Sequence, residues 1–202
     1  MVDPCEMENR YSVSAWAGSA APGQSVGRVL VLPGGRYTVD HPLLFWSCHV
    51  LVQAGWRVVT MRWNWTESDE PRGFVEAGAE QLDREAGPAP TTLVVAKSLG
   101  SYAAPWASTC GYPGVWLTPV LTDDFVADAL ARFATSGLLV GGTGDRLWDS
   151  DRAAATGLET LEIPGADHGL QLSSDWRSSL AVLHQTLAAV EDFATKVSAT
   201  VP

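Results

Sequence analysis

The stretch of residues 91–101 constrains what this chain can fold into more than any other. It begins with an apolar, largely β-branched run that is typical of a buried strand, and the run stops at a small-x-Ser-x-Gly sequence built on Ala96, Ser98 and Gly100. A serine on a sharp turn from a strand into a helix projects its hydroxyl above the sheet, and its neighbours must be small because the turn brings backbones close together. The stretch therefore predicts a nucleophile elbow with Ser98 at its tip.

The same stretch has a second interpretation. Serine is a favoured N-cap residue, and Ser98 would then only cap a helix that follows a strand. Ala96 also stands where the strict pattern has glycine. In the elbow interpretation, the N–H of Leu99 lies at the helix N-terminus, where unpaired N–H groups favour developing negative charge. We therefore expect Leu99 to donate one hydrogen bond of an oxyanion hole.

Composition limits the class of protein. A chain of 202 residues is long enough for one sizeable core and short for two, so we expect a single domain over residues 1–202. The formal net charge of -10 argues against nucleic acid and against an anionic membrane surface as partners, because both attract clustered lysine and arginine. Residues 1–10 show no basic region leading into an apolar run, so we expect no secretory signal and a poorly ordered segment there.

The cysteines indicate the redox compartment. Cys5, Cys48 and Cys110 are odd in number and widely spaced, which fits neither a disulfide framework nor a metal site. No uninterrupted apolar segment approaches the length that spans a membrane. We therefore expect reduced thiols in a cytoplasmic protein that holds no metal ion.

Strand and helix patterns alternate along the chain. Such alternation predicts an α/β fold with one mostly parallel sheet of about six or seven strands and helices on both faces, without an insertion long enough for a cap domain. The expected strands are at 11–16, 28–32, 56–63, 91–97, 114–121, 137–140 and 158–163, and the expected helices are at 42–54, 72–86, 123–133 and 175–197, with further helical sequence after Ser98 and before residue 158.

Three residues with complementary chemistry each follow a different predicted strand. A serine nucleophile needs a histidine base, and the histidine needs a carboxylate that holds its tautomer. Ser98, Asp145 and His168 occur in the order typical of a serine hydrolase built on a parallel sheet. We expect them to form a catalytic triad. Asp123 and Asp124 also follow a strand and are alternatives for the acid, although their position before a helical pattern favours capping.

The loop after the strand at 28–32 is rich in glycine. We expect the N–H of Gly35, or as second choice that of Arg36, to donate the second hydrogen bond of the oxyanion hole. The alternative interpretation is that the loop is an ordinary tight turn. Arg36 and Tyr37 of this loop, with Trp63 and Trp148, are expected to contact substrate. Packing of the tryptophans against the sheet is the alternative interpretation.

The motifs also resemble a known family. Residues 33–42, 96–101, 142–145 and 167–169 resemble the compact α/β-hydrolases related to dienelactone hydrolase, particularly the branch that includes testis-expressed protein 30. The resemblance implies an α/β-hydrolase fold without a large cap, with the triad and oxyanion roles on the residues named above. Pro33, Ala96 and Ser101 stand where that family usually has histidine, glycine and glycine.

The expected function is hydrolysis of a carboxylic ester or thioester of a small molecule through an acyl-enzyme, with neither a metal nor an organic cofactor. Two alternatives stay open. The first is a weakly active or inactive fold that serves as a ligand- or protein-binding module. The second is a specialised cyclisation or release step in a biosynthetic pathway. The sequence does not indicate the substrate's identity or the oligomeric state.

Overall fold

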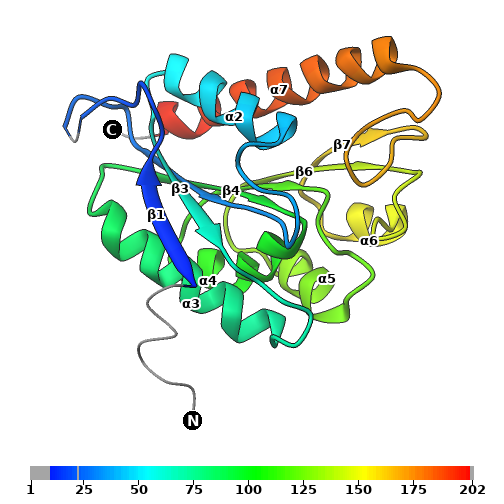
Figure 1. The fold of residues 1–202 in the computed structure, drawn as a ribbon, viewed down its shortest axis with the longest axis horizontal. Helices are drawn as coiled ribbons and strands as arrows, with labels where there is room; N and C mark the ends of the chain where they lie inside the picture. Colours follow the sequence, from blue (N-terminus) through cyan, green and yellow to red (C-terminus); the bar gives the residue numbers. More distant parts are fainter. Residues whose placement is uncertain (1–9, 22, 201–202) are drawn as a thin grey trace.

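The computed structural model describes residues 10–21 and 23–200, and within them the chain builds a seven-stranded sheet (Figure 1). The strand order is β1-β3-β2-β4-β5-β6-β7. β1 runs antiparallel to β3 and the other neighbouring pairs are parallel, so the prediction of a mostly parallel sheet is confirmed. The strands are β1 (Tyr11–Ala15), β2 (Arg28–Leu32), β3 (Arg57–Trp63), β4 (Thr92–Lys97), β5 (Gly114–Leu117), β6 (Gly137–Gly142) and β7 (Glu159–Ile163).

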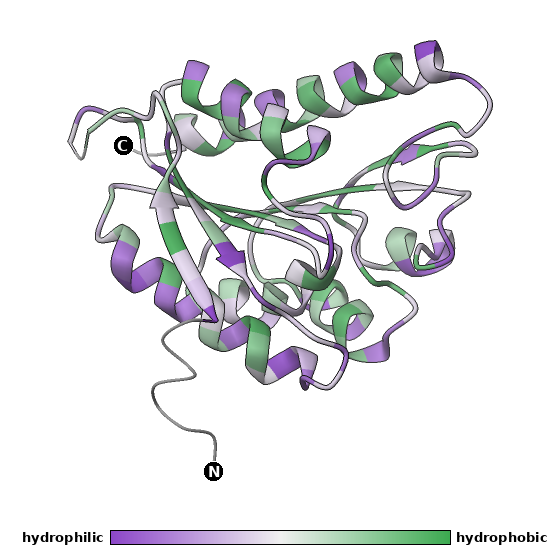
Figure 2. Cartoon of the chain, in the orientation of Figure 1, coloured by the Kyte–Doolittle hydropathy of each residue, from purple (hydrophilic) through white to green (hydrophobic). Residues whose placement is uncertain are grey.

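Helices cover both faces of the sheet (Figure 1). α2 and α7 lie on one face, while α3, α4, α5 and α6 lie on the other. Figure 2 shows hydrophobic residues on the helix sides that turn toward the sheet and hydrophilic residues on their outer sides. The helices are α2 (Pro42–Gln53), α3 (Pro71–Ala86), η1 (Ser98–Ala103), α4 (Ala104–Thr109), α5 (Asp124–Ala131), α6 (Ser150–Ala155) and α7 (Trp176–Ala199).

The central strands separate two hydrophobic cores. β2, β4, β5 and β6 are buried along their whole length, which explains their nearly continuous apolar sequences. Side chains of a strand alternate between the faces, so Val95 packs under α2 and α7 while Val94 and Ala96 pack on the opposite side. The same alternation sends Lys97 toward the α2 and α7 face.

Several element boundaries differ from the sequence prediction by one or two residues, and two differences are more pronounced. The strand expected at 114–121 ends at Leu117, because Thr118 adopts a φ of 43° and Pro119 has no N–H to donate to a neighbouring strand. The helix after the elbow begins as the 3-10 helix η1 before it continues as α4. The poorly ordered segment expected at residues 1–10 lies outside the described residues except for Arg10, and a single domain over residues 1–202 stays a prediction.

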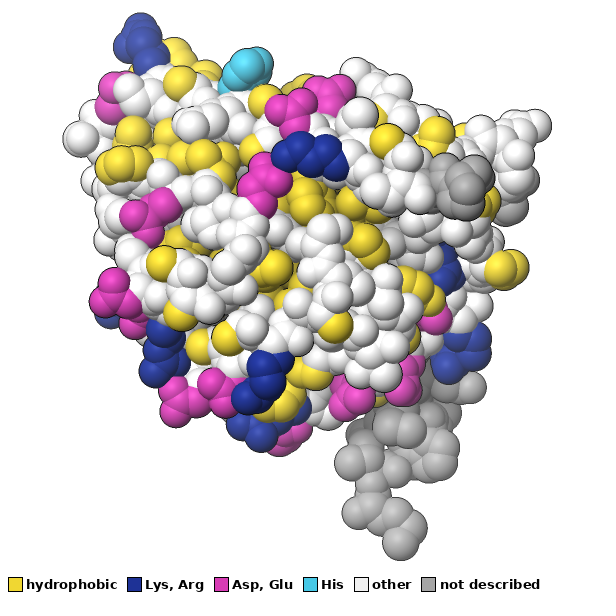
Figure 3. Space-filling view, turned by 180° about the vertical axis from the view of Figure 1, so that it is seen from behind, with side chains coloured by type: hydrophobic (Ala, Val, Ile, Leu, Met, Phe, Trp, Pro, Cys, Tyr) yellow, Lys and Arg dark blue, Asp and Glu magenta, His cyan; other side chains and the backbone are white. Residues whose placement is uncertain are grey.

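The surface mixes charges of both signs. On the face seen in Figure 3, acidic and basic side chains lie next to each other near the lower edge, and apolar side chains are interspersed among polar atoms. Across the described ranges, no helix has both the length and the apolar composition that crossing a membrane requires.

Candidate active site

Ser98 lies at the turn from β4 into η1 and adopts a φ of 50°, a conformation that few non-glycine residues take. Two small residues make this turn possible. A β-carbon at Gly100 would lie 2.9 Å from the carbonyl oxygen of Leu32 and 3.0 Å from that of Pro33, so the backbones touch there. Ala96 is fully buried against its neighbours, which shows that a methyl group fits at the position where the strict pattern has glycine. The turn therefore has the geometry of a nucleophile elbow.

The three expected triad side chains meet in a single chain of hydrogen bonds. His168 Nε2 lies 2.8 Å from Ser98 Oγ, and His168 Nδ1 lies 2.7 Å from Asp145 Oδ2. A proton on Nδ1 donates to Asp145, which leaves Nε2 free to accept the proton of the serine hydroxyl. Asp145 follows β6 and His168 follows β7, so the carboxyl ends of three parallel strands bring the residues together.

The surroundings of Asp145 favour the ionised form of its side chain. Its side chain is 1% exposed, and its second oxygen accepts a hydrogen bond from the N–H of Leu147 at 2.9 Å. Burial raises the pKa of the Asp145 carboxyl, but the hydrogen bonds from His168 and Leu147, together with the charges of His168 and Lys97, hold that pKa below its usual value. A buried carboxylate of this kind fixes the histidine tautomer and stabilises an imidazolium.

The two alternative acids are engaged elsewhere. Asp123 caps α5, because its Oδ1 accepts a hydrogen bond from the N–H of Phe125 at 2.8 Å, and its Oδ2 accepts one from the Tyr102 hydroxyl at 2.7 Å. Asp124 forms an ion pair with Arg152 at 2.8 Å. Neither carboxylate contacts His168, so the geometry favours Asp145 as the partner of the imidazole.

Lys97 is a residue of this site that the sequence pattern did not indicate. It precedes Ser98 and its side chain is fully buried. Its Nζ donates a hydrogen bond to the Thr118 hydroxyl and another, of 2.8 Å, to the carbonyl oxygen of His168, and it lies 4.9 Å from the centre of the Tyr37 ring. Burial lowers the pKa of Lys97 to about 7, against the opposing effect of the nearby carboxylates.

Backbone strain gathers around Lys97. Among the described residues, the non-glycine residues with positive φ are Ser98, Thr118 and Leu170. Ser98 follows Lys97, Thr118 accepts its hydrogen bond, and Leu170 lies in the loop of His168. Such conformations cost roughly 1–3 kcal/mol each and concentrate at functional sites. The sequence distinguishes Lys97 only as one of two lysines in the chain, and this does not predict that it is buried.

The glycine-rich loop after β2 lies against the elbow. A β-carbon at Gly34 would lie 3.5 Å from Ser98 Cβ, and the Gly34 carbonyl accepts a hydrogen bond from Trp63 Nε1 at 3.0 Å. The N–H of Gly35 has no acceptor within the described part of the chain. A β-carbon at Gly35 would lie 3.7 Å from Leu99 Cδ2, so the two residues expected to form the oxyanion hole are neighbours in space.

Three of the four residues expected to contact substrate have other roles in the structure. Trp148 is 7% exposed, donates a hydrogen bond from Nε1 to Glu162 at 2.7 Å and fills the space above Gly141, which favours the alternative interpretation that it packs against the sheet. Trp63 holds the loop of Gly34 and packs against Phe74. Arg36 is exposed and forms an ion pair with Glu67.

Tyr37 is the fourth of these residues, and it borders an apolar pocket. Its hydroxyl accepts a hydrogen bond from the N–H of Leu43 at 2.9 Å. A separate open pocket of about 530 Å³ lies over Asp145 and His168. Both pockets include Gly169 in their lining.

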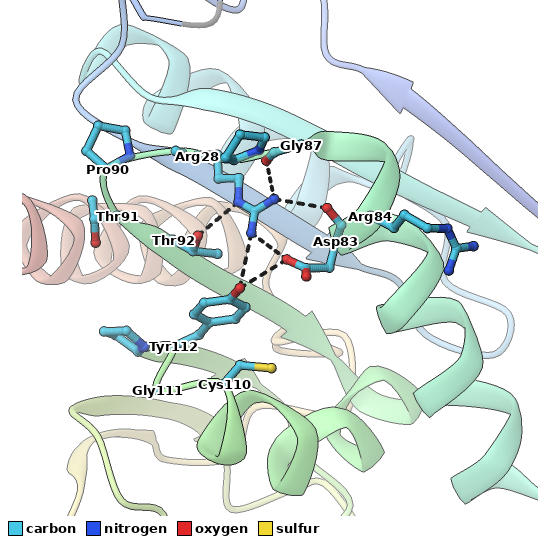
Figure 4. Close-up of a pocket in the computed structure, with 13 residues that line it drawn as sticks. Arg28, Asp83, Arg84, Gly87, Pro90, Thr91, Thr92, Cys110, Gly111 and Tyr112 are labelled. Carbon is cyan, nitrogen blue, oxygen red and sulfur yellow. Dashed lines mark hydrogen bonds and ion pairs between the residues drawn. The ribbon is translucent and has the colours of Figure 1, made fainter.

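A larger cavity of about 580 Å³ lies at the opposite edge of the sheet, around the buried Arg28 (Figure 4). The Arg28 guanidinium donates hydrogen bonds to Thr92 Oγ1, to the carbonyl oxygens of Asp83 and Gly87, to Asp83 Oδ1 and to the Tyr112 hydroxyl. These acceptors use all five donors of the guanidinium, so Arg28 has none left for a ligand. Among the described residues, no group of three or more His, Cys, Asp or Glu side chains is arranged to hold a metal ion.

Comparison with known proteins shows which solved structures share this fold. No family model matches the chain, and a search of curated proteins finds no match. Est1E from Butyrivibrio proteoclasticus, solved with ferulic acid bound, superposes with a TM-score of 0.74 at 12% identity, covering 94% of this chain and 96% of Est1E. A putative α/β-hydrolase from Agrobacterium tumefaciens gives a TM-score of 0.72 at 15% identity, with 95% and 93% covered.

A third similar structure bears on the absence of a cap. It is a serine hydrolase without a lid from Xanthomonas campestris, with a TM-score of 0.61 at 13% identity over 91% of this chain and 89% of that one. The sheet order, the helices on both faces and these likenesses define the class: the chain has the α/β-hydrolase fold, in a compact version whose described residues include no large cap domain.

Proposed function

We propose that the protein is a serine hydrolase that cleaves a carboxylic ester or thioester of a small molecule through an acyl-enzyme. The observation that carries the proposal is the continuous chain of hydrogen bonds from Asp145 through His168 to Ser98, at 2.7 and 2.8 Å, with the serine on a strained turn. The esterases among the similar structures, including one from Pyrococcus furiosus, support ester chemistry, and so does the resemblance of the motifs to compact relatives of dienelactone hydrolase.

The geometry supports a two-step mechanism. His168 Nε2 accepts the proton of Ser98 Oγ as the oxygen attacks the carbonyl carbon, and Asp145 stabilises the imidazolium that forms. The N–H groups of Gly35 and Leu99 hold the negative oxygen of the tetrahedral intermediate. His168 then protonates the leaving alcohol or thiol. In the second step His168 takes a proton from water, which attacks the acyl-enzyme and releases the acid.

The inactive binding module is the main alternative, and the assembled site argues against it. A binding module has no need of an aligned nucleophile, base and acid, or of a serine held at a φ of 50°. The specialised cyclisation or release step uses the same acyl-enzyme and differs only in what attacks it, so the nucleophile of the second step separates the two. Product analysis in the presence of competing alcohols distinguishes hydrolysis from such transfer.

The proposal is tested by exposure to a fluorophosphonate followed by intact-mass analysis. The native protein should gain one adduct, and Ser98→Ala should gain none. Ser101→Ala is the matched control, because Ser101 is a buried serine of the same turn whose hydroxyl donates to the Ser98 carbonyl rather than to a base. A folded native protein that stays unlabelled at high reagent excess would refute the hydrolase proposal.

A further inference from the structure

An apolar pocket of about 350 Å³ lies between the loop after β2 and the loop that follows His168. Two of the few large apolar side chains that the described part of the chain exposes lie at this pocket: Trp176 is 63% exposed and Leu180 is 55% exposed. A concentration of exposed apolar surface around a concave site is typical of a ligand-binding site. We name it the Tyr37–Leu180 pocket, and its apolar lining includes Tyr37, Leu43, Leu170, Leu172, Trp176 and Leu180.

The pocket lies beside the candidate nucleophile. Its inner wall includes Tyr37, and a β-carbon at Gly34 would lie 3.1 Å from Tyr37 Cβ and 3.5 Å from Ser98 Cβ, so Tyr37 and Ser98 flank the same glycine. The lining also includes Gly169, which follows the histidine whose Nε2 is 2.8 Å from Ser98 Oγ. The two loops that flank the candidate nucleophile therefore both contribute to the pocket, together with residues of α2 and α7.

Several polar groups of the lining form hydrogen bonds within the protein. The Tyr37 hydroxyl accepts a hydrogen bond from the N–H of Leu43, and the N–H of Leu172 donates to Ser179 Oγ at 2.8 Å. The exposed polar residues Gln171 and Ser173 complete this part of the lining. Ser179 also bonds the carbonyl oxygen of Asp175 at the start of α7. A wall held in this way is formed before a ligand arrives, so binding does not have to order it.

The lining also sets the chemistry of the occupant. None of the residues that line the pocket is charged. A phosphate or carboxylate would lose its hydration there without gaining a partner, whereas a hydrocarbon group would lose only its contact with water. The occupant is therefore an uncharged apolar group.

The position of the pocket indicates which side of an ester, the acyl group or the leaving alcohol, it binds. Tyr37 follows Gly35 closely in the loop that would hold the carbonyl oxygen, so the pocket begins next to the reacting carbonyl. The leaving alcohol must instead face His168 Nε2 to receive its proton. We infer that the Tyr37–Leu180 pocket binds the acyl group, and that the substrates are esters or thioesters whose acyl chain is uncharged and apolar. This inference rests on the proposed hydrolase function.

The test compares two fluorophosphonates, one with a methyl and one with an octyl group on phosphorus, by the rate at which intact mass shows the Ser98 adduct. The native protein should react faster with the octyl probe. Leu180→Asn and Trp176→Ala should each slow the octyl reaction by about tenfold and leave the methyl reaction within about twofold. Trp46→Ala is the matched control, because Trp46 is an exposed tryptophan outside the pocket, on α2.

Three outcomes would overturn the inference. The first is equal slowing of both probes, the second is no effect of either substitution, and the third is a dependence on the alkyl chain of the leaving group alone. Binding of the uncharged ester methyl octanoate to the Ser98→Ala variant, measured by calorimetry, separates a failure of the pocket from a failure of the hydrolase proposal. If the native protein resists both probes, methyl octanoate binding that Leu180→Asn abolishes keeps the pocket as an acyl site without hydrolysis, and absence of binding removes it.

Discussion

The Nζ atom of Lys97 lies 2.8 Å from the carbonyl oxygen of His168, so the residue before the elbow serine holds the loop that carries the imidazole. The same amine donates to Thr118, which follows β5. One buried side chain thus connects the carboxyl ends of β4 and β5 with the loop after β7. Because Ser98 and His168 follow different strands, this connection holds the loop of His168 next to Ser98.

Replacing Lys97 with methionine should lower turnover while preserving the fold. The substitution keeps the length of the side chain and removes both hydrogen bonds, and a displacement of His168 by about 1 Å is enough to cost about a hundredfold in rate. We expect a fall in kcat of at least about tenfold with KM nearly unchanged, measured with a chromogenic ester. Lys196→Met is the control, because Lys196 is the second lysine of the chain and forms only an exposed ion pair with Glu159. Unchanged kcat in Lys97→Met would show that the contact with His168 is dispensable.

The stability of the protein should depend on the protonation of Lys97. Burial lowers the pKa of Lys97 to about 7 in the folded protein, and in the unfolded chain a lysine has a pKa of about 10.4. Between these values the unfolded state binds more protons, so the contribution of Lys97 to the free energy of unfolding rises with pH, by up to about 1.4 kcal/mol per unit, and is constant below pH 7.

Urea unfolding of the native protein and of Lys97→Met between pH 6 and pH 10 measures this contribution by difference, so that the titration of other groups cancels. The free energy of unfolding of the native protein should rise relative to the variant above about pH 7. A difference that does not change over this range would mean that Lys97 keeps its charge in the folded protein.

The meeting of Ser98, His168 and Asp145 could be predicted from the sequence because it follows from the geometry of parallel sheets. The carboxyl ends of parallel strands lie at one edge, so Ser98, Asp145 and His168 had to approach each other once the strands before them were recognised. From β4 to β7 each connection crosses over to a parallel neighbour, whereas β4 follows β3 in the chain and pairs with β2, so the alternating pattern alone does not determine the strand order.

The direction of side chains in the loops could not be predicted in the same way. Trp148 comes shortly after Asp145, yet its ring packs into the core. Gly141 of β6 has no side chain, and the Trp148 ring occupies the space that a side chain there would fill. Lys97 was overlooked because a charged residue at the end of a strand usually faces water. Its contacts come from Thr118 and His168, which are distant in the sequence, so no local pattern shows them.

Asp145→Asn should lower ester turnover by about 10⁴-fold while leaving the fold intact, because an amide in place of the carboxylate favours the wrong tautomer of His168. Asp123→Asn is the matched control. Its carboxylate caps α5 and accepts from Tyr102, so that substitution should affect stability and leave turnover nearly unchanged. Steady-state kinetics on both variants decides the assignment. Loss of turnover in Asp123→Asn with near-normal turnover in Asp145→Asn would transfer the acid role to Asp123.

Trp148→Ala should destabilise the protein without changing its preference among acyl groups. The indole is 7% exposed, belongs to the core on the α3 side of the sheet and donates to Glu162 at 2.7 Å. Truncating a buried tryptophan leaves a cavity and typically costs about 3–5 kcal/mol in the free energy of unfolding. Urea unfolding should show this loss, whereas Trp46→Ala, at a position that is 47% exposed, should show little. A chain-length series of esters completes the test, because a changed acyl profile with unchanged stability would return Trp148 to the substrate pocket.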